Sequence, residues 1–177
     1  MLLIDRSNTA ILSLISAVLH ESGHIFLMYM FSSPPEKLTL GFFGMRIEKR
    51  ENTLSFLQEA WVAFAGPCVN LLICFFSFII YQFCEEEIML RLAFINLLLG
   101  AFNLKPIEPL DGARIIKNTL SIFFNEQCIE KILNIFLYIF LSLLFMICLV
   151  VTSFYGFNFT LLIFCVYISL CVILKRR

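Results

Sequence analysis

Long apolar stretches constrain this chain more than any other feature. Of its 177 residues, 60% are hydrophobic and 15% are charged, whereas roughly a quarter of the residues in a soluble domain are charged. A transmembrane helix needs about 20 predominantly apolar residues, and we predict five such spans. The predicted spans are Thr9–Phe31, Leu57–Cys84, Ile88–Leu104, Ile132–Val151 and Phe157–Leu174.

This pattern predicts an all-α polytopic membrane protein with about five transmembrane helices. We expect one integral membrane domain over residues 1–177, with a three-helix core at 9–113 and accessory helices at 129–174. A separate soluble domain has no room. The 13 basic and 13 acidic residues give no net charge, so nothing in the composition would attract nucleic acid.

Basic residues fall mainly on one side of the predicted spans. Only Arg6 and Arg91 lie on the opposite side, and Lys105 lies inside a span. Because cytoplasmic loops are enriched in Lys and Arg, we predict an outside N-terminus and a cytoplasmic C-terminus. The basic residues on the cytoplasmic side would be Lys37, Arg46, Lys49, Arg50, Arg114, Lys117, Lys131, Lys175, Arg176 and Arg177.

Two segments between the predicted spans differ from the spans in their residue pattern. Leu38–Ile47 is rich in strand-forming residues and predicts a small β-hairpin on the cytoplasmic side. Ala113–Phe124 alternates apolar residues with Arg114, Lys117 and Asn118, which favours a short helix at the membrane surface.

The first span contains the chain's only two histidines, in the run His20-Glu21-Ser22-Gly23-His24. Ionisable residues inside a span are costly and therefore indicate function. Positions i and i+4 share one face of a helix, so both imidazoles can reach one metal ion. Glu21 is then placed to take a proton from a metal-bound water rather than to bind the metal. The alternative is a polar pair that only holds helices together.

The third span ends in a segment that contains Pro106 and Pro109, which a helix does not accommodate. Broken backbone at membrane depth is tolerated where it lines a cavity. A catalytic zinc needs three protein ligands and an open position, and Asp111 is the natural third ligand. Glu108 is either an ion-pair partner of Lys105 or an alternative ligand. A polar break in the second span, at 65–70, falls at a compatible depth.

Together, the runs at residues 20–24, 65–70 and 103–113 resemble the motifs of the site-2 proteases, which are intramembrane zinc metalloproteases. The third run is most similar to that of the small SpoIVFB-like sporulation branch. The resemblance implies that the three-helix core is catalytic. It implies His20, His24 and Asp111 as zinc ligands, Glu21 as catalytic base, Asn103 as a group that holds the substrate or the oxyanion, and Asn70 as a residue lining the cleft.

The resemblance implies a zinc metalloendopeptidase that cuts a membrane-embedded or membrane-associated protein near the cytoplasmic face. A transcription-factor precursor would be one such substrate, and a membrane partner would regulate the timing. We expect no CBS or PDZ domain within residues 1–177. The strand around Leu40–Ile47 would either pair with an unwound substrate or only shield the site. A zinc transporter and an inactive membrane scaffold remain as alternatives.

Overall fold

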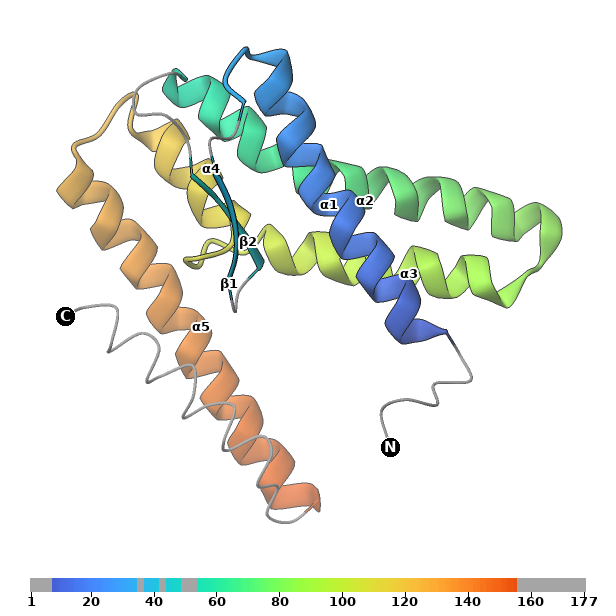
Figure 1. Cartoon of the computed structure of the whole chain (residues 1–177). Coiled ribbons are helices and arrows are strands. Elements are labelled where there is room, and N and C mark those ends of the chain that lie inside the picture. Colours follow the sequence, from blue (N-terminus) through green and yellow to red (C-terminus); the bar gives the residue numbers. More distant parts are fainter. Residues whose placement is uncertain (1–7, 35–36, 42–43, 49–53, 156–177) are drawn as a thin grey trace. The chain divides into compact units, whose positions relative to one another are not determined.

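The computed structural model describes residues 8–34, 37–41, 44–48 and 54–155, which are mainly helical (Figure 1). The contacts divide the chain into two compact units, Met1–Glu130 and Lys131–Arg177. In chain order, the elements are α1 (Thr9–Met30), β1 (Lys37–Gly41), β2 (Gly44–Glu48), α2 (Phe56–Cys84), α3 (Glu87–Asn103), α4 (Asp111–Leu120) and α5 (Glu126–Tyr155).

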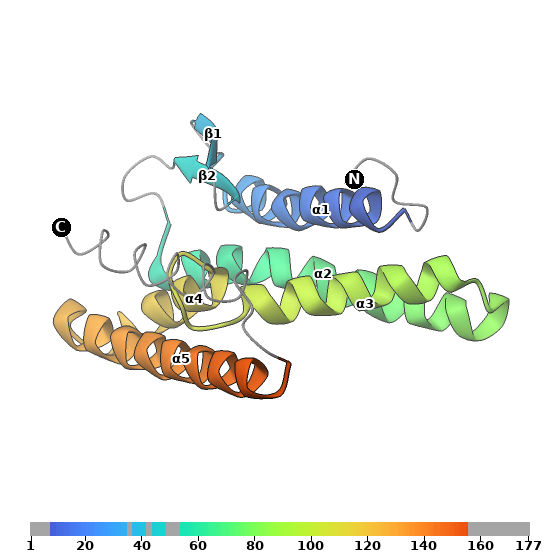
Figure 2. The ribbon, with the colours of Figure 1, turned by 90° about the horizontal axis from the view of Figure 1, so that it is seen from below.

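The helices α1, α2 and α3 form the core of the first unit, because each contacts the other two. α2 and α3 run antiparallel on either side of a short turn (Figures 1 and 2). α2 begins with a capping box, in which Ser55 Oγ accepts from the Gln58 N–H and Gln58 Oε1 accepts from the Ser55 N–H. This reciprocal pair fixes the start of the helix that carries the middle motif.

α1 and α2 approach closely at Gly23. A Cβ at this position would lie 2.8 Å from Val69 Cγ2 and 2.9 Å from the Ala65 carbonyl oxygen. Small residues let helix backbones come together where no water drives the association. The glycine between the two histidines therefore brings their turn of α1 against the middle of α2.

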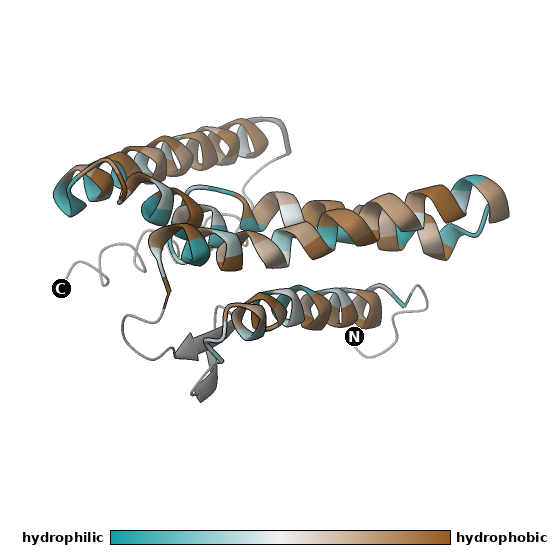
Figure 3. Ribbon diagram, turned by 90° about the horizontal axis from the view of Figure 1, so that it is seen from above, coloured by the Kyte–Doolittle hydropathy of each residue, from teal (hydrophilic) through white to brown (hydrophobic). Residues whose placement is uncertain are grey.

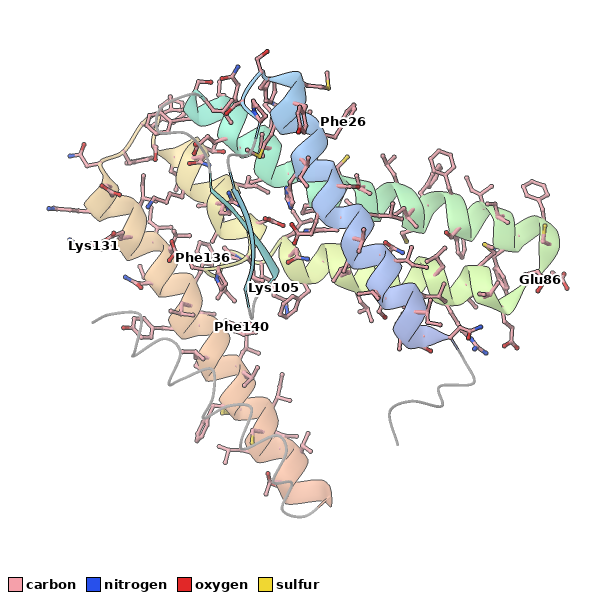
Figure 4. All side chains as sticks on the ribbon, in the orientation of Figure 1. Phe26, Glu86, Lys105, Lys131, Phe136 and Phe140 are labelled. Carbon is pink, nitrogen blue, oxygen red and sulfur yellow. The ribbon has the colours of Figure 1, made fainter. Side chains whose placement is uncertain are left out.

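Apolar side chains cover the outside of the helices, as the brown ribbon in Figure 3 shows for α2, α3 and α5. Phe26 projects outward from α1 (Figure 4), and Leu14 and Phe83 are among the most exposed side chains. A protein dissolved in water leaves much less apolar surface exposed. Among the described residues, three helical segments are long and apolar enough to cross a bilayer: Thr9–Met30, Phe56–Cys84 and Glu126–Ser153. The chain is a multi-pass membrane protein.

The predicted first, second and fourth spans are confirmed as long apolar helices in α1, α2 and α5. The predicted third span corresponds to α3, whose 17 residues extend about 26 Å at 1.5 Å per residue. It is shorter than the other three helices. The predicted fifth span, Phe157–Leu174, lies outside the residues that the structure describes.

The predicted interruption after the third span is confirmed. The chain leaves the helix after Asn103 and turns through residues 104–110, where the Ile107 N–H donates to the Lys105 carbonyl and the Leu110 N–H to the Ile107 carbonyl. A Cβ at Gly112 would overlap the Leu104 carbonyl group. Only glycine lets the chain return so closely to the end of α3. The amphipathic helix predicted from Ala113 is α4, which begins two residues earlier.

The polar run at residues 65–70 lies inside α2. α2 continues as one helix from Phe56 to Cys84 through Pro67. In membrane helices neighbouring groups compensate for the missing proline N–H.

The segment predicted as a hairpin contains β1 and β2, which pair antiparallel with Leu38 opposite Ile47 and Leu40 opposite Met45. The linking residues Phe42 and Phe43 lie outside the described part of the chain. The side of the membrane on which this ladder lies stays a prediction.

Candidate metal centre

The two histidines of α1 point their rings toward each other in the interior of the first unit. Their ring centroids are 4.9 Å apart, and their Nε2 atoms are 3.3 Å apart. His20 is 5% exposed and His24 is 3% exposed. The shared face follows from the i, i+4 spacing on a helix, and the close approach of α2 at Gly23 buries this face.

Asp111 completes the cluster from the first turn of α4. Its Oδ2 lies 3.0 Å from His20 Nε2 and 3.3 Å from His24 Nε2. The residue is 7% exposed, and its Oδ1 lies 3.8 Å from the Arg114 guanidinium.

The three groups fit a metal ion. One ligand atom from each of His20, His24 and Asp111 lies within 4.8 Å of the other two. Zinc–nitrogen bonds of about 2.05 Å at tetrahedral angles would separate ligand atoms by about 3.3 Å. The observed separations of 3.0–3.3 Å agree. The cluster is a metal-binding group with the donor set and spacing that zinc prefers.

Two features of α2 hold the histidine rings in place. His24 Nδ1 donates to the Val62 carbonyl oxygen at 2.7 Å, which leaves Nε2 free to bind a metal. Gly66 lies against both rings, because a Cβ there would overlap His24 Nε2 and lie 2.8 Å from His20 Cε1. α2 thus forms a wall of the metal-binding group.

Comparison with known proteins agrees with this arrangement. The model of peptidase family M50 matches residues 82–147, which include Asp111. The solved site-2 protease from Methanocaldococcus jannaschii superposes with a TM-score of 0.63 at 28% identity, covering 89% of this chain and 72% of that chain. This chain is similar to the site-2 proteases of peptidase family M50.

Two curated relatives are also similar to this chain. A zinc metalloprotease of Methanocaldococcus jannaschii is 34% identical over 120 residues, covering 63% of this chain and 34% of the relative. A candidate zinc metalloprotease of Synechocystis is 35% identical over 117 residues, covering 62% of this chain and 30% of the relative. The chain therefore spans about a third of the length of these curated relatives.

The other residues that the sequence predicted for the site differ in their burial and contacts. Glu21 follows His20 directly and is half-buried. Asn103 is half-buried at the end of α3, where its amide donates to the Leu99 carbonyl at 3.1 Å. Glu108 is exposed, and the metal-binding group found among the described residues does not include it. Lys105 lies 4.7 Å from the centre of the Phe102 ring.

Asn70 occupies a position that its motif alone does not reveal. Its side chain is fully buried, and its amide nitrogen lies 2.9 Å from His20 Nδ1. The residue therefore contacts a metal-ligating side chain. The sequence also did not reveal that Val62 and Gly66 contact the histidine rings. A backbone carbonyl leaves no trace in the residue type, whereas Gly66 next to Pro67 is a signal of close packing that could have been read.

Proposed function

We propose that this chain is an intramembrane zinc metalloendopeptidase that cuts a membrane-embedded or membrane-associated protein. The observation that carries the proposal is the convergence of His20, His24 and Asp111 in the interior of a bundle with an apolar exterior. The curated relatives named as zinc metalloproteases support the choice of zinc and of peptide hydrolysis.

Glu21 and Asn103 have separate roles in the proposed peptide hydrolysis. When bound, zinc would polarise a peptide carbonyl and make a water molecule more acidic. Glu21 accepts the proton of the attacking water and returns it to the leaving amine. Asn103 donates its amide N–H to the substrate or to the oxyanion, after giving up its bond to the Leu99 carbonyl.

The proposal includes a third membrane crossing by α3. Its ends are polar, with Glu86 and Glu87 at one end and Lys105 at the other (Figure 4). The only charged residue between them, Arg91, pairs with Glu87 at 2.7 Å. The excess of Lys and Arg on one side supports an outside N-terminus and an active site in the cytoplasmic half of the membrane. Residues 9–113 then form the catalytic core, accompanied by accessory helices from residue 129 onward.

The substrate helix must unwind locally, because its backbone carbonyls are already hydrogen-bonded. Within the described residues the sheet consists of β1 and β2 alone, so an edge of this ladder offers backbone groups that an unwound segment can join. Replacing Phe43 and Met45 with proline removes two backbone donors and should abolish cleavage while zinc stays bound. Unchanged cleavage would refute the pairing.

The motif spacing shared with the sporulation branch makes a membrane-tethered transcription-factor precursor, timed by a membrane partner, the first substrate class to test.

The deciding experiment compares wild type with Glu21→Gln and Asp111→Ala in detergent. Zinc content is measured by mass spectrometry, and cleavage is measured on a panel of fluorescently tagged single-span reporter proteins. We expect about one zinc per chain in wild type and in Glu21→Gln, none in Asp111→Ala, and cleavage by wild type alone. Removing a general base lowers the rate by about 10²–10⁴-fold.

Three outcomes would contradict the proposal. Folded wild type without zinc would indicate an inactive scaffold. Zinc with equal processing by wild type and Glu21→Gln would exclude Glu21 as the base. Zinc flux across vesicles that carry wild type, with no cleavage of any reporter, would instead favour the transporter.

A further inference from the structure

The two histidines of the metal-binding group differ in the group that contacts their second ring nitrogen, Nδ1. A metal-ligating imidazole binds through one nitrogen and donates the N–H of the other to an acceptor. His24 meets this requirement, since its Nδ1 donates to the Val62 carbonyl. Behind His20, the nearest polar group is the side-chain amide of Asn70, with its nitrogen 2.9 Å from Nδ1.

The orientation of the Asn70 amide fits a His20 ring whose proton is on Nε2, which is the form without a bound metal. A nitrogen of Asn70 that donates to His20 Nδ1 leaves the ring proton on Nε2, where it faces Asp111 Oδ2 at 3.0 Å. An Nε2 that carries a proton has no lone pair for a metal. His20 must therefore move its proton to Nδ1 before it can ligate.

The oxygen of the same amide takes no part in the contact with His20. Asn70 is fully buried, and within the described part of the chain its Oδ1 has no hydrogen-bond partner. Gly100 of α3 closes the other side, because a Cβ there would lie 3.4 Å from Asn70 Cβ. An asparagine amide presents a donor and an acceptor at nearly the same place. Turning it over puts Oδ1 opposite Nδ1 without moving either helix.

We propose that Asn70 is a positioning residue that selects the metal-binding tautomer of His20, by turning its amide so that Oδ1 accepts the Nδ1–H. This inference rests on the proposed zinc site and assigns Asn70 a role behind the metal rather than in the substrate cleft. Asparagine suits both states of His20, because it donates to the metal-free ring and accepts from the metal-bound one.

Asn96 provides a matched control. It is also fully buried, and its Oδ1 has no partner among the described residues. Its amide, however, donates to Ser16 Oγ and to the Leu92 carbonyl rather than to a histidine. Replacing either asparagine with leucine removes one buried amide from the same three-helix core. Only the change at residue 70 also removes the acceptor for His20.

The test measures the affinity for Zn²⁺ of the purified full chain by competition with a chromophoric chelator. We expect Asn70→Leu to bind about 10- to 100-fold more weakly, as for other losses of a group behind a ligand. Asn96→Leu should bind like wild type. Asn70→Asp should bind at least as tightly as wild type, because a carboxylate also accepts the Nδ1–H.

Equal affinity of Asn70→Leu and wild type would overturn the inference, as would an equal loss in Asn96→Leu or in Asn70→Asp. Wild type without zinc would overturn the proposed function itself. If Asn70→Leu does not fold, ¹⁵N NMR of the histidine rings in wild type decides, because the chain has only two histidines. Zinc should leave His20 protonated at Nδ1, and a zinc-bound His20 protonated at Nε2 would contradict the inference.

Discussion

Two buried polar clusters lie one helical turn apart on α1. The first joins His20 and His24 to Asp111. The second joins Ser16, which precedes His20 by four residues, to Asn96 of α3 at 2.9 Å. Both are buried. The first is contacted by Asn70 and the second includes Asn96, and neither asparagine oxygen has a partner in the described residues. Burial and polarity therefore do not distinguish them.

The direction of the hydrogen bonds distinguishes them. In the second cluster a donor meets two acceptors, since the Asn96 amide nitrogen donates to Ser16 Oγ and to the Leu92 carbonyl. In the first, two imidazole nitrogens and one carboxylate oxygen converge within 3.3 Å. When the His20 proton is on Nδ1, three lone pairs face one another, and they repel unless a cation lies between them. A convergence of acceptors, rather than buried polarity, marks the metal site.

The largest expected effect comes from removing one of the converging acceptors. Asp111→Ala should weaken Zn²⁺ binding by more than about 100-fold, because a full set of ligands contributes about 10–16 kcal/mol in zinc peptides. Ser16→Ala removes a buried polar group from the neighbouring cluster and should leave zinc affinity unchanged. Isothermal titration with chelator-buffered zinc measures both. Zinc retained by Asp111→Ala would assign the third ligand to another residue.

The sequence predicted the first cluster well and did not predict the second. Two histidines at i and i+4 identify their own face of the helix, and a carboxylate after a proline-broken span is a rare combination in a membrane protein. Ser16 and Asn96 have no such pattern, since serine and asparagine occur in many membrane helices for packing. Their pairing depends on the relative placement of α1 and α3, which no local pattern specifies.

The same reasoning explains what was missed around the histidines. The contact between His24 and the Val62 carbonyl depends on the rotation of α2 about its axis, which follows from the close approach at Gly23. The position of Asn70 behind His20 depends on the same rotation. α2 also continues through Pro67, because a proline in a packed membrane helix is compatible with a continuous helix.

A smaller effect on zinc affinity should follow from adding a side chain to Gly66 of α2, which lies against the histidine rings of the first cluster. Gly66→Ala places a methyl group into His24 Nε2 and close to the His20 ring. Overpacking costs about 1–3 kcal/mol, so Zn²⁺ binding should weaken by roughly 10- to 100-fold through displaced rings. Gly100→Ala is the control, because its Cβ would make an ordinary contact of 3.4 Å with Asn70 Cβ. Chelator competition on both variants measures the difference.

A result in which Gly100→Ala weakens zinc binding as much as Gly66→Ala would contradict this explanation. The effect would then come from the general fit of the three helices rather than from the position of the imidazoles.

The smallest expected effect concerns the second cluster alone. Ser16→Ala removes the acceptor for Asn96, which keeps its bond to the Leu92 carbonyl. A hydrogen bond between membrane helices contributes about 0.6 kcal/mol on average, so the free energy of unfolding in mixed detergent micelles should fall by about that amount. Ser13→Ala is the control, because the exposed Ser13 hydroxyl donates to the Thr9 carbonyl within α1 and should leave stability unchanged. If Ser16→Ala lowered zinc affinity more than stability, the two clusters would be coupled along α1, and hydrogen-bond direction alone would not separate their functions.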